Sequence, residues 1–302
     1  MDSGNGQLNK RRRLGGREQV SAYLFVLPAV LGVLIFYFVP LLVSFFGSFT
    51  NWGGLEGVFD ASFVGFKNYA GILKDPYFGQ AVLNTLFTMI GIPIGITLSL
   101  LLALLLNRGL KGTNVFRVVY YVPVVCGIVA ITLMWQNFLA PNGPFNKLLE
   151  KMGIAGMDWL AHRVWAKVAI VVMCVWKGLG YSTLLYIAGL QGVPRTYYEA
   201  AKLDGAGGMQ LFFKITVPLV RPVTFFLFVT GIITGAQLFT EAQLILPAAS
   251  RNQNYVKTVV LYLYEQFGYG YVGYASAVAW LLAVVVFAAT GLQFALEGRK
   301  KD

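Results

Sequence analysis

Charged and hydrogen-bonding side chains are rare within the long apolar runs of this sequence. Each is a candidate functional group, because a hydrocarbon environment makes it costly. Lys177 lies near the middle of one such run. In a later run, Thr234, Gln237 and Glu241 follow an i, i+3, i+7 spacing that places them on one helix face, which can line a hydrophilic path. For Lys177, snorkelling towards the membrane surface or pairing with Glu241 is an equally good interpretation.

Glycines near these residues predict where a helix is less rigid or where two helices pack closely. The stretch after Lys177 predicts a glycine-softened helix that exposes backbone and hydroxyl groups to a water-filled cavity, through Gly178, Gly180, Tyr181 and Ser182. Gly231 and Gly235 form a Gly-x-x-x-Gly pair, which favours a helix-packing contact over a binding feature.

The sequence offers little material for catalysis or metal binding. His162 is the only histidine and has the charged neighbourhood of a solvated loop, so a histidine-based metal site or a Ser-His-Asp triad is not expected. Cys126 and Cys174 lie inside apolar runs, which argues against a disulfide. A Gly-x4-Gly-Lys-Ser/Thr phosphate-binding loop is missing. We therefore expect a protein that is not an enzyme and holds no cofactor or metal.

The elements that position these residues are membrane helices. The chain is 57% hydrophobic and 12% charged with a mean hydropathy of +0.65, which indicates an all-α integral membrane protein. Six runs are long enough to cross a hydrocarbon core, which needs about 20 helical residues. Kinks are predicted at Pro93, Pro123 and Gly180. The predicted spans are Val20 to Phe49, Ala81 to Leu106, Val118 to Leu139, Trp165 to Leu190, Pro218 to Ile245 and Tyr274 to Leu296.

The net charge of +11 is interpreted as topology rather than nucleic-acid binding. With six spans, fifteen Lys and Arg residues fall on one side and eight on the other, and the richer side is cytoplasmic by the positive-inside rule. Both termini are therefore expected in the cytoplasm. The predicted organisation is a basic tail over 1–19, a membrane domain over 20–296 and a short tail over 297–302.

The loops on the other side are rich in aromatic residues, including Trp52, Phe59, Phe63 and Phe66. An aromatic belt at the membrane interface is the simpler interpretation. A docking surface for an extracytoplasmic partner is the alternative.

The loop over 194–218 has the features of a short helix with a defined start and stop. Pro194 suits a first helical turn, and Gly205 can supply the left-handed conformation that ends a helix. Residues 209–215 can form another turn or two before Pro218 opens the fifth span.

The small side chains of Ala200 and Ala201 allow another protein to approach this helix closely, and Glu199 offers a charge for a basic or hydrogen-bonding socket. These features alone fit two interpretations, a short rigid helix that binds another protein and a loop that is merely solvated.

The spacing of this loop resembles the EAA loop of ABC importer permeases. Glu199-Ala-Ala is followed after three residues by Gly205, and after nine more by Ile215-Thr-Val-Pro218, with Val217 where leucine is common. The resemblance implies a type I (MetI-like) core of six transmembrane helices in the bacterial cytoplasmic membrane. It also implies a coupling helix seated in a cytoplasmic ATPase, with these coupling residues: Glu199, Ala200, Ala201, Asp204, Gly205, Ile215 and Pro218.

Within that family the chain is most similar to permeases for sugars and glycerol phosphate. The resemblance rests on Trp176-Lys-Gly-Leu-Gly-Tyr181, Ala188-Gly-Leu-Gln191 and Gly273-Tyr-Ala-Ser-Ala277, whereas Pro247-Ala-Ala-Ser250 departs from the glycine-rich stretch common after span five. Together with Lys177 and Glu241, the solute pathway is then expected to include Cys174, Gly178, Tyr181, Thr234 and Gln237.

The resemblance implies several partners. They are a second homologous permease, a cytoplasmic ATPase dimer that binds ATP and magnesium, an extracytoplasmic solute-binding protein, membrane lipid and a small-molecule solute. A secondary transporter or channel is the alternative function. It would need intramembrane carboxylates and internal repeats, and Glu241 is the one candidate carboxylate.

Overall fold

The computed structural model describes residues 16–107, 120–247 and 254–298, and helices dominate this part of the chain. Its β structure is a single isolated bridge between Thr50 and Phe63. The predicted all-α class is therefore confirmed. Parts of the predicted organisation lie outside the described residues: positions 1–15 of the N-terminal tail, the loop with Arg108, Lys111 and Arg117, positions 248–250 of the departure after span five, and positions 299–302.

Four described helices are long and apolar enough to cross a membrane, and they match the first, second, fourth and sixth predicted spans. The first runs through α1 (Gly16–Val33), a π-helical turn η1 (Leu34–Phe38) and α2 (Val39–Gly47). The others are α4 (Pro76–Met89) with α5 (Gly91–Asn107), α9 (Trp165–Gln191) and α16 (Val272–Gly298).

The third and fifth predicted spans are interrupted. In the third, a helix over 120–125 ends before Gly127, and α7 (Ile128–Phe138) follows. In the fifth, Pro218 lies in the short α12 (Val217–Leu219), and α13 (Arg221–Ala236) begins after a bend of 63°. The helix predicted to run to residue 245 ends at 236 and resumes as α14 (Thr240–Leu244). The count of six spans remains a prediction.

Two of the three predicted kinks coincide with helix breaks. Pro93 has no N–H to donate to the carbonyl four residues earlier, and the helix is interrupted at Ile90, between α4 and α5. Pro123 precedes the break at 126–127. At Gly180 α9 continues without a break, and the kink there stays a prediction. A Cβ on Gly180 would lie 2.6 Å from the carbonyl oxygen of Tyr120, so this glycine permits close helix packing.

Glycines also set the packing at the centre of the bundle, where α5 runs along α9 and both meet α13. A Cβ on Gly91 would lie 3.2 Å from Val171 and from Val175 on α9. A Cβ on Gly231 would lie 2.8 Å, and one on Gly235 3.2 Å, from the side chain of Ile92. The predicted packing role of the Gly-x-x-x-Gly pair is therefore confirmed, because both glycines admit the same α5 residue.

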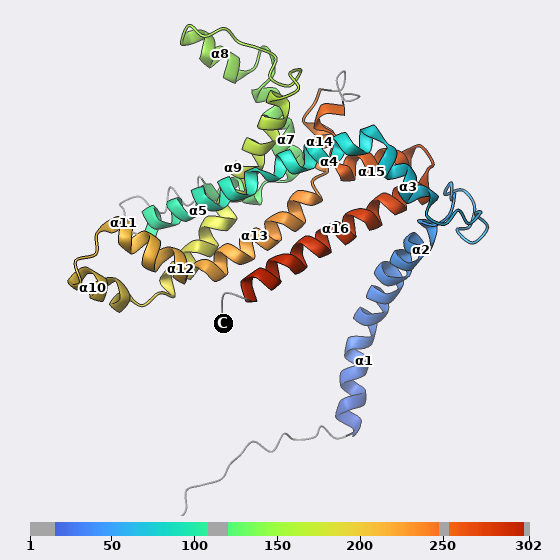
Figure 1. Cartoon of the computed structure of the whole chain (residues 1–302), viewed down its shortest axis with the longest axis horizontal. Helices are drawn as coiled ribbons and strands as arrows, with labels where there is room; N and C mark the ends of the chain where they lie inside the picture. The colour runs from blue at the N-terminus through green and yellow to red at the C-terminus, as the bar shows by residue number, and fades with distance from the viewer. Residues whose placement is uncertain (1–15, 108–119, 248–253, 299–302) are drawn as a thin grey trace, which may run out of the picture.

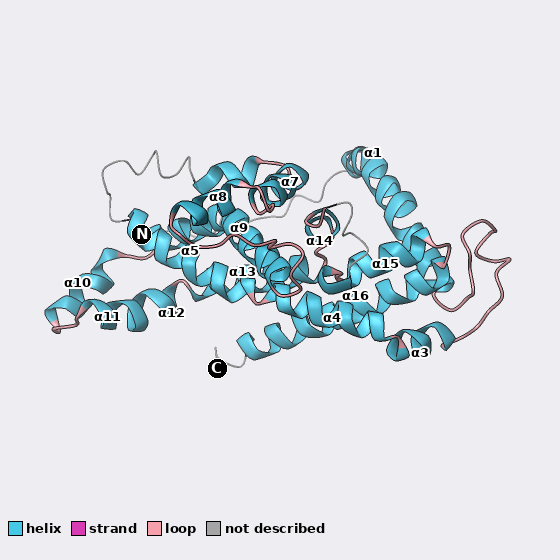
Figure 2. Cartoon of the chain, turned by 90° about the horizontal axis from the view of Figure 1, so that it is seen from above, coloured by secondary structure: helices cyan, strands magenta, loops and turns pink. Residues whose placement is uncertain are grey.

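The bundle has two distinct ends. Figures 1 and 2 show α10 (Arg195–Leu203), α11 (Gly208–Leu211) and α12 at one end and α3 (Lys67–Lys74) at the other. In Figure 1 α1 stands away from the bundle, whereas α2 packs against α16, with the ring centroids of Phe45 and Trp280 4.8 Å apart. No residue of the apolar window of this span is buried. The arm that carries α8 (Pro144–Lys151) projects from α7.

An aromatic loop joins α2 to α3 and is fastened to the start of α16. The ring of Phe49 contacts those of Phe63, Phe66 and Tyr69. The backbone N–H of Gly273 donates to the carbonyl of Trp52 over 2.9 Å. This contact needs a glycine, because a Cβ at 273 would lie 2.3 Å from a backbone oxygen.

Candidate functional site

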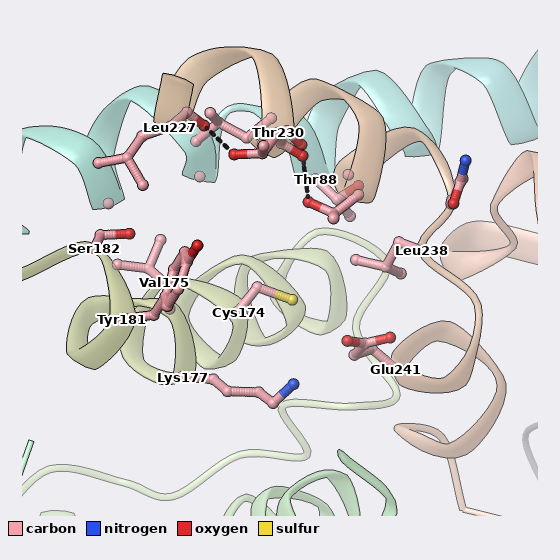
Figure 3. Close-up of a pocket in the computed structure, with 18 of the residues that line it drawn as sticks. Thr88, Cys174, Val175, Lys177, Tyr181, Ser182, Leu227, Thr230, Leu238 and Glu241 are labelled. Carbon is pink, nitrogen blue, oxygen red and sulfur yellow. Dashed lines mark hydrogen bonds between the residues drawn. The ribbon is translucent and has the colours of Figure 1, made fainter. Parts of the chain in front are cut away.

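A cavity of about 730 Å³ lies between α5, α9, α13 and the break that follows α13. Figure 3 shows side chains from these elements pointing into it. All seven residues predicted for the solute pathway line this one cavity: Cys174, Lys177, Gly178, Tyr181, Thr234, Gln237 and Glu241. The structure thus brings together residues from two separate helical regions, although their contact with a solute remains a prediction.

The α9 wall presents its residues by ordinary helical spacing. Cys174, Lys177, Gly178 and Tyr181 recur at three- and four-residue intervals, so they share one face of a straight helix. Helix α9 runs from Trp165 to Gln191 without a break, so glycines do not interrupt it. Cys174, Lys177 and Tyr181 present side chains to the cavity, and Gly178, which has no side chain, presents its backbone.

The opposite wall corrects the expectation that Thr234, Gln237 and Glu241 share one helix face. Thr234 lies on α13, Gln237 is the residue that ends this helix, and Glu241 lies in α14. The three still reach the same cavity, because the break turns the chain around it. A broken helix at such a site offers backbone groups as well as side chains to a solute.

The cavity lining contains both hydrogen-bond donors and acceptors. Thr230 and Thr234 donate their hydroxyl protons to carbonyls of their own helix, over 2.8 and 2.9 Å, so they present acceptor oxygens to the cavity. The side chains of Tyr181 and Gln237 have no hydrogen-bond partner among the described residues. A polyhydroxyl solute suits this lining, because each sugar hydroxyl both donates and accepts.

Lys177 and Glu241 are the two charged residues among those lining the cavity, and they do not form an ion pair with each other. Figure 3 shows the Lys177 amine, the Cys174 thiol and the Glu241 carboxylate reaching the same part of it. The pairing suggested for Lys177 is therefore not found between these described residues. Snorkelling and contact with solute both remain open.

Sequence reasoning missed two polar residues that line the cavity, Thr88 and Thr230. Thr230 lies four residues before Thr234, so helical spacing was a signal that could have identified it. Thr88 carried no such signal, because its place depends on the packing of α4 against α13.

The second candidate region is the coupling segment, α10 to α12, at one end of the bundle. As predicted, Gly205 ends α10 in the left-handed region, with φ of 81°. The N–H groups of Gly205 and Ala206 donate to the carbonyls of Lys202 and Ala201 over 3.0 and 2.9 Å, the bonding pattern of a Schellman cap. Pro194 stands one residue earlier than predicted, directly before the helix.

The predicted coupling residues are accessible. Helix α10 has no buried residue, and Glu199, Ala200, Asp204, Gly205 and Pro218 are exposed, while Ala201 and Ile215 are partly buried. Several large apolar side chains are also exposed on this segment: Tyr197, Leu203, Met209 and Phe213. Such a patch on a cytosolic or interfacial surface is typical of a protein-binding site.

The coupling segment packs on the bundle through Phe212 and Val217, which lie against the buried cluster that includes Leu106 and Leu190, and one hydrogen bond joins it internally. The hydroxyls of Tyr198 and Thr216 lie 3.2 Å apart, which joins α10 to the π-helical turn η2 (Phe212–Thr216). Beyond the bend, Arg221 at the start of α13 forms an ion pair of 2.8 Å with Glu297 near the end of α16.

The remaining sequence predictions concern metals and thiols. His162 is exposed in a loop, as predicted, and its Nδ1 accepts from the N–H of Val164 over 3.2 Å. Cys126 and Cys174 are free thiols. Within the described ranges, no group of three or more His, Cys, Asp or Glu is placed to hold a metal ion.

Comparison with known proteins decides the family. Residues 91–302 match the family of the binding-protein-dependent transport system inner membrane component. The chain is 33% identical over 296 residues to the probable ABC transporter permease protein YesP of Bacillus subtilis strain 168, covering 94% of this chain and 93% of the relative. This chain belongs to that family. It is thus a multi-pass membrane subunit of ABC transporters and not itself an enzyme.

Other relatives and solved structures agree with this assignment. The lactose transport system permease protein LacF of Rhizobium radiobacter is 32% identical over 289 residues, covering 93% of this chain and 95% of LacF. A crystal structure of a bacterial ABC transporter that imports the acidic polysaccharide alginate contains a chain with the same fold. Its TM-score is 0.82 at 22% identity, with coverage of 94% of this chain and 96% of that one.

Proposed function

We propose that this permease forms half of the pathway for a sugar or sugar-like solute and takes its energy from a separate ATPase through the segment Glu199–Gly205. One observation carries the proposal. Helix α13 begins beside the exposed coupling segment and ends at the break that lines the cavity, so a single element connects both regions.

The sugar class is supported by the relatives and by the lining. Besides LacF, the relatives include the arabinooligosaccharides transport system permease protein AraP of Bacillus subtilis strain 168, 32% identical over 289 residues. The hydroxyl and amide groups of the cavity suit a polyhydroxyl solute, and the two charges that line it, Lys177 and Glu241, have opposite signs.

The proposed assembly contains a second homologous permease, an ATPase dimer and an extracytoplasmic binding protein that delivers the solute. A solved structure of an alginate ABC transporter, with a TM-score of 0.79 to this chain, includes a sugar-bound periplasmic protein and supports the last of these partners. Both termini and the coupling segment lie in the cytoplasm in this proposal, as do the predicted tails over 1–19 and 297–302.

The mechanism is a two-state change driven from the cytoplasmic side. ATP binding closes the ATPase dimer and draws the two coupling helices together, and the core then changes from inward-facing to outward-facing. The energy enters as a difference in ATP affinity between the two states. The chain needs no nucleotide site for this role.

Charge reversal in the coupling helix tests the proposal. We expect Glu199→Arg to abolish co-purification with the ATPase while the permease still inserts in the membrane, because the reversed charge meets the socket that holds Glu199. Glu150→Arg on α8 is the matched control, since Glu150 is also an exposed helical glutamate. Transport that is unaffected by Glu199→Arg would favour the alternative, a secondary transporter or channel.

A further inference from the structure

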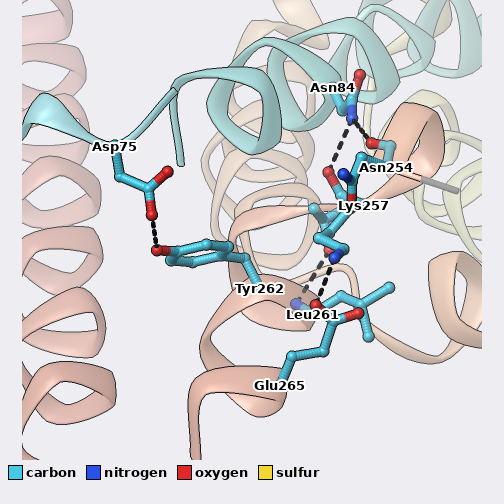
Figure 4. A network of polar contacts seen from close by, with 8 residues as sticks. Asp75, Asn84, Asn254, Lys257, Leu261, Tyr262 and Glu265 are labelled. Carbon is cyan, nitrogen blue, oxygen red and sulfur yellow. Dashed lines mark hydrogen bonds and ion pairs between the residues drawn. The ribbon is translucent and has the colours of Figure 1, made fainter. Parts of the chain in front are cut away.

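The segment that follows α14 carries an unusually dense set of polar contacts for a region between apolar helices. It comprises the 3₁₀ turn η4 (Asn254–Val256), Lys257, Thr258 and the first turn of α15 (Val259–Gly268). Figure 4 shows this segment against α4, and the Lys257 amine forms an ion pair with Glu265. We refer to residues 254–261 as the buckle.

Asn84 of α4 ties the buckle to two helices. Its side chain is 1% exposed. Its amide nitrogen donates to the carbonyls of Asn254 and Lys257, each over 2.9 Å, and its amide oxygen accepts from the Lys167 amine of α9 over 3.1 Å. Both donor hydrogens and the acceptor of this buried amide are therefore used, which fixes the buckle relative to α4 and α9.

A second pair of bonds fixes the start of α15. The Thr85 hydroxyl accepts from the N–H of Val259 over 3.0 Å. Thr258 is fully buried, and its hydroxyl donates to the carbonyl of Leu238 over 2.6 Å. The same hydroxyl accepts from the N–H of Leu261 over 3.4 Å, which is the N-cap bond of α15.

The carbonyl of Leu238 lies in the break between α13 and α14, between Gln237, which ends α13, and the cavity-lining Phe239. In an uninterrupted helix this carbonyl would accept from the N–H four residues later. Leu238 is buried, so a carbonyl left without a partner there costs free energy. The Thr258 hydroxyl provides the missing donor from a different part of the chain.

We propose that Thr258 is a positioning residue of the cavity: its hydroxyl holds the break at Leu238 and thereby sets Gln237 and Glu241 in the cavity wall. The buckle supplies a rigid support, because Asn84 and Thr85 fasten it to α4. The transport role of the cavity rests on the proposed function, whereas the positioning concerns this chain alone.

A native thiol reports on the break. Leu238 belongs to the largest buried apolar cluster, and Cys174 of α9 packs against that cluster while also lining the cavity. If the break relaxes, Leu238 shifts and the Cys174 thiol becomes more accessible from the cavity. A Cys126→Ser background leaves Cys174 as the single thiol of the chain.

The test measures how fast a small maleimide labels Cys174 in membranes that contain the full chain. We expect Thr258→Val to raise the labelling rate about fivefold or more, because valine keeps the branched shape but donates no hydrogen bond. Thr258→Ser keeps the donor and should label at the original rate. Thr97→Val is the matched control, because its hydroxyl bonds only within α5, to Pro93, and lies outside the cavity.

Equal labelling of Thr258→Val and the parent chain would overturn the proposal. So would a Thr258→Ser variant that labels as fast as Thr258→Val, since the hydroxyl would then not be the cause. If Thr258→Val and Thr258→Ala both fail to accumulate in membranes while Thr258→Ser accumulates, Thr258 serves folding as a whole and the positioning role is wrong. None of these outcomes depends on the ATPase. Failure of the proposed function would appear in the Glu199→Arg experiment and would leave the labelling result unchanged.

Discussion

The coupling segment and the buckle are both short polar connections between helices, yet they use their side chains in opposite ways. The coupling segment leaves apolar groups such as Leu203 exposed, and its hydrogen bond between Tyr198 and Thr216 lies within the segment itself. The buckle buries the Thr258 hydroxyl, which donates to the carbonyl of Leu238 in the break, and its backbone carbonyls accept from the buried Asn84 amide of α4. A surface that binds another protein thus leaves apolar side chains exposed to solvent. A segment that supports the interior of its own chain instead buries polar groups and gives them hydrogen-bond partners.

The largest effect is expected at the coupling end. Leu203 is 90% exposed, so its replacement should not affect folding. We expect Leu203→Asp to weaken binding of the ATPase about thirtyfold, because a charge replaces an apolar contact at a protein interface. Binding of purified ATPase to the permease in nanodiscs measures this. Leu148→Asp, at a 54% exposed leucine of α8, should bind normally, and equal weakening by both variants would contradict the comparison.

A substitution in the packed centre of the bundle should lower the stability of the permease and leave its binding of the ATPase unchanged. We expect Gly231→Ala to lower the free energy of unfolding by about 1–3 kcal/mol, because its methyl group would approach Ile92 to 2.8 Å. Gly291→Ala in α16 is the control, since no atom lies within 4 Å of the position that its methyl group would take. Thermal unfolding in detergent compares the two, and a Gly231→Ala chain as stable as the control would refute the packing role.

The smallest effect is expected at the ion pair of Arg221 and Glu297, which joins the start of α13 to the end of α16. Their side chains are 38% and 23% exposed, so solvent screens the pair and its contribution is about 0.5 kcal/mol. Arg221→Glu should therefore reduce thermal stability only slightly, and adding Glu297→Arg should restore it. A double variant no better than the single one would show that the pair itself contributes nothing.

Local signals in the sequence predicted much of this molecule. The cap at Gly205 follows from its left-handed conformation, and the contact of Gly231 and Gly235 follows from their spacing. Residues of α9 line the cavity together because three- and four-residue spacing is sufficient to place them on one face.

The break after Ala236 was not predicted, because no proline or glycine marks it in Gln237-Leu-Phe-Thr240. It depends on the hydroxyl of Thr258, twenty residues later, and such a contact has no periodic pattern. The role of Gly180 in packing was not predicted either. A glycine inside an apolar helix can mark a close crossing as well as a kink, and the crossing at Gly180 depends on the position of Tyr120.

The 63° bend at Val220 has a consequence for how force is transmitted. Val220 is buried and its backbone leaves the helical conformation, so the segment that ends with α12 meets α13 at a steep angle. A force along the axis of α12 therefore acts largely across the axis of α13 and tilts this helix. Only a smaller component acts along the axis of α13. The far end of α13, where the cavity wall begins, would then move by an arc whose size grows with the length of the helix.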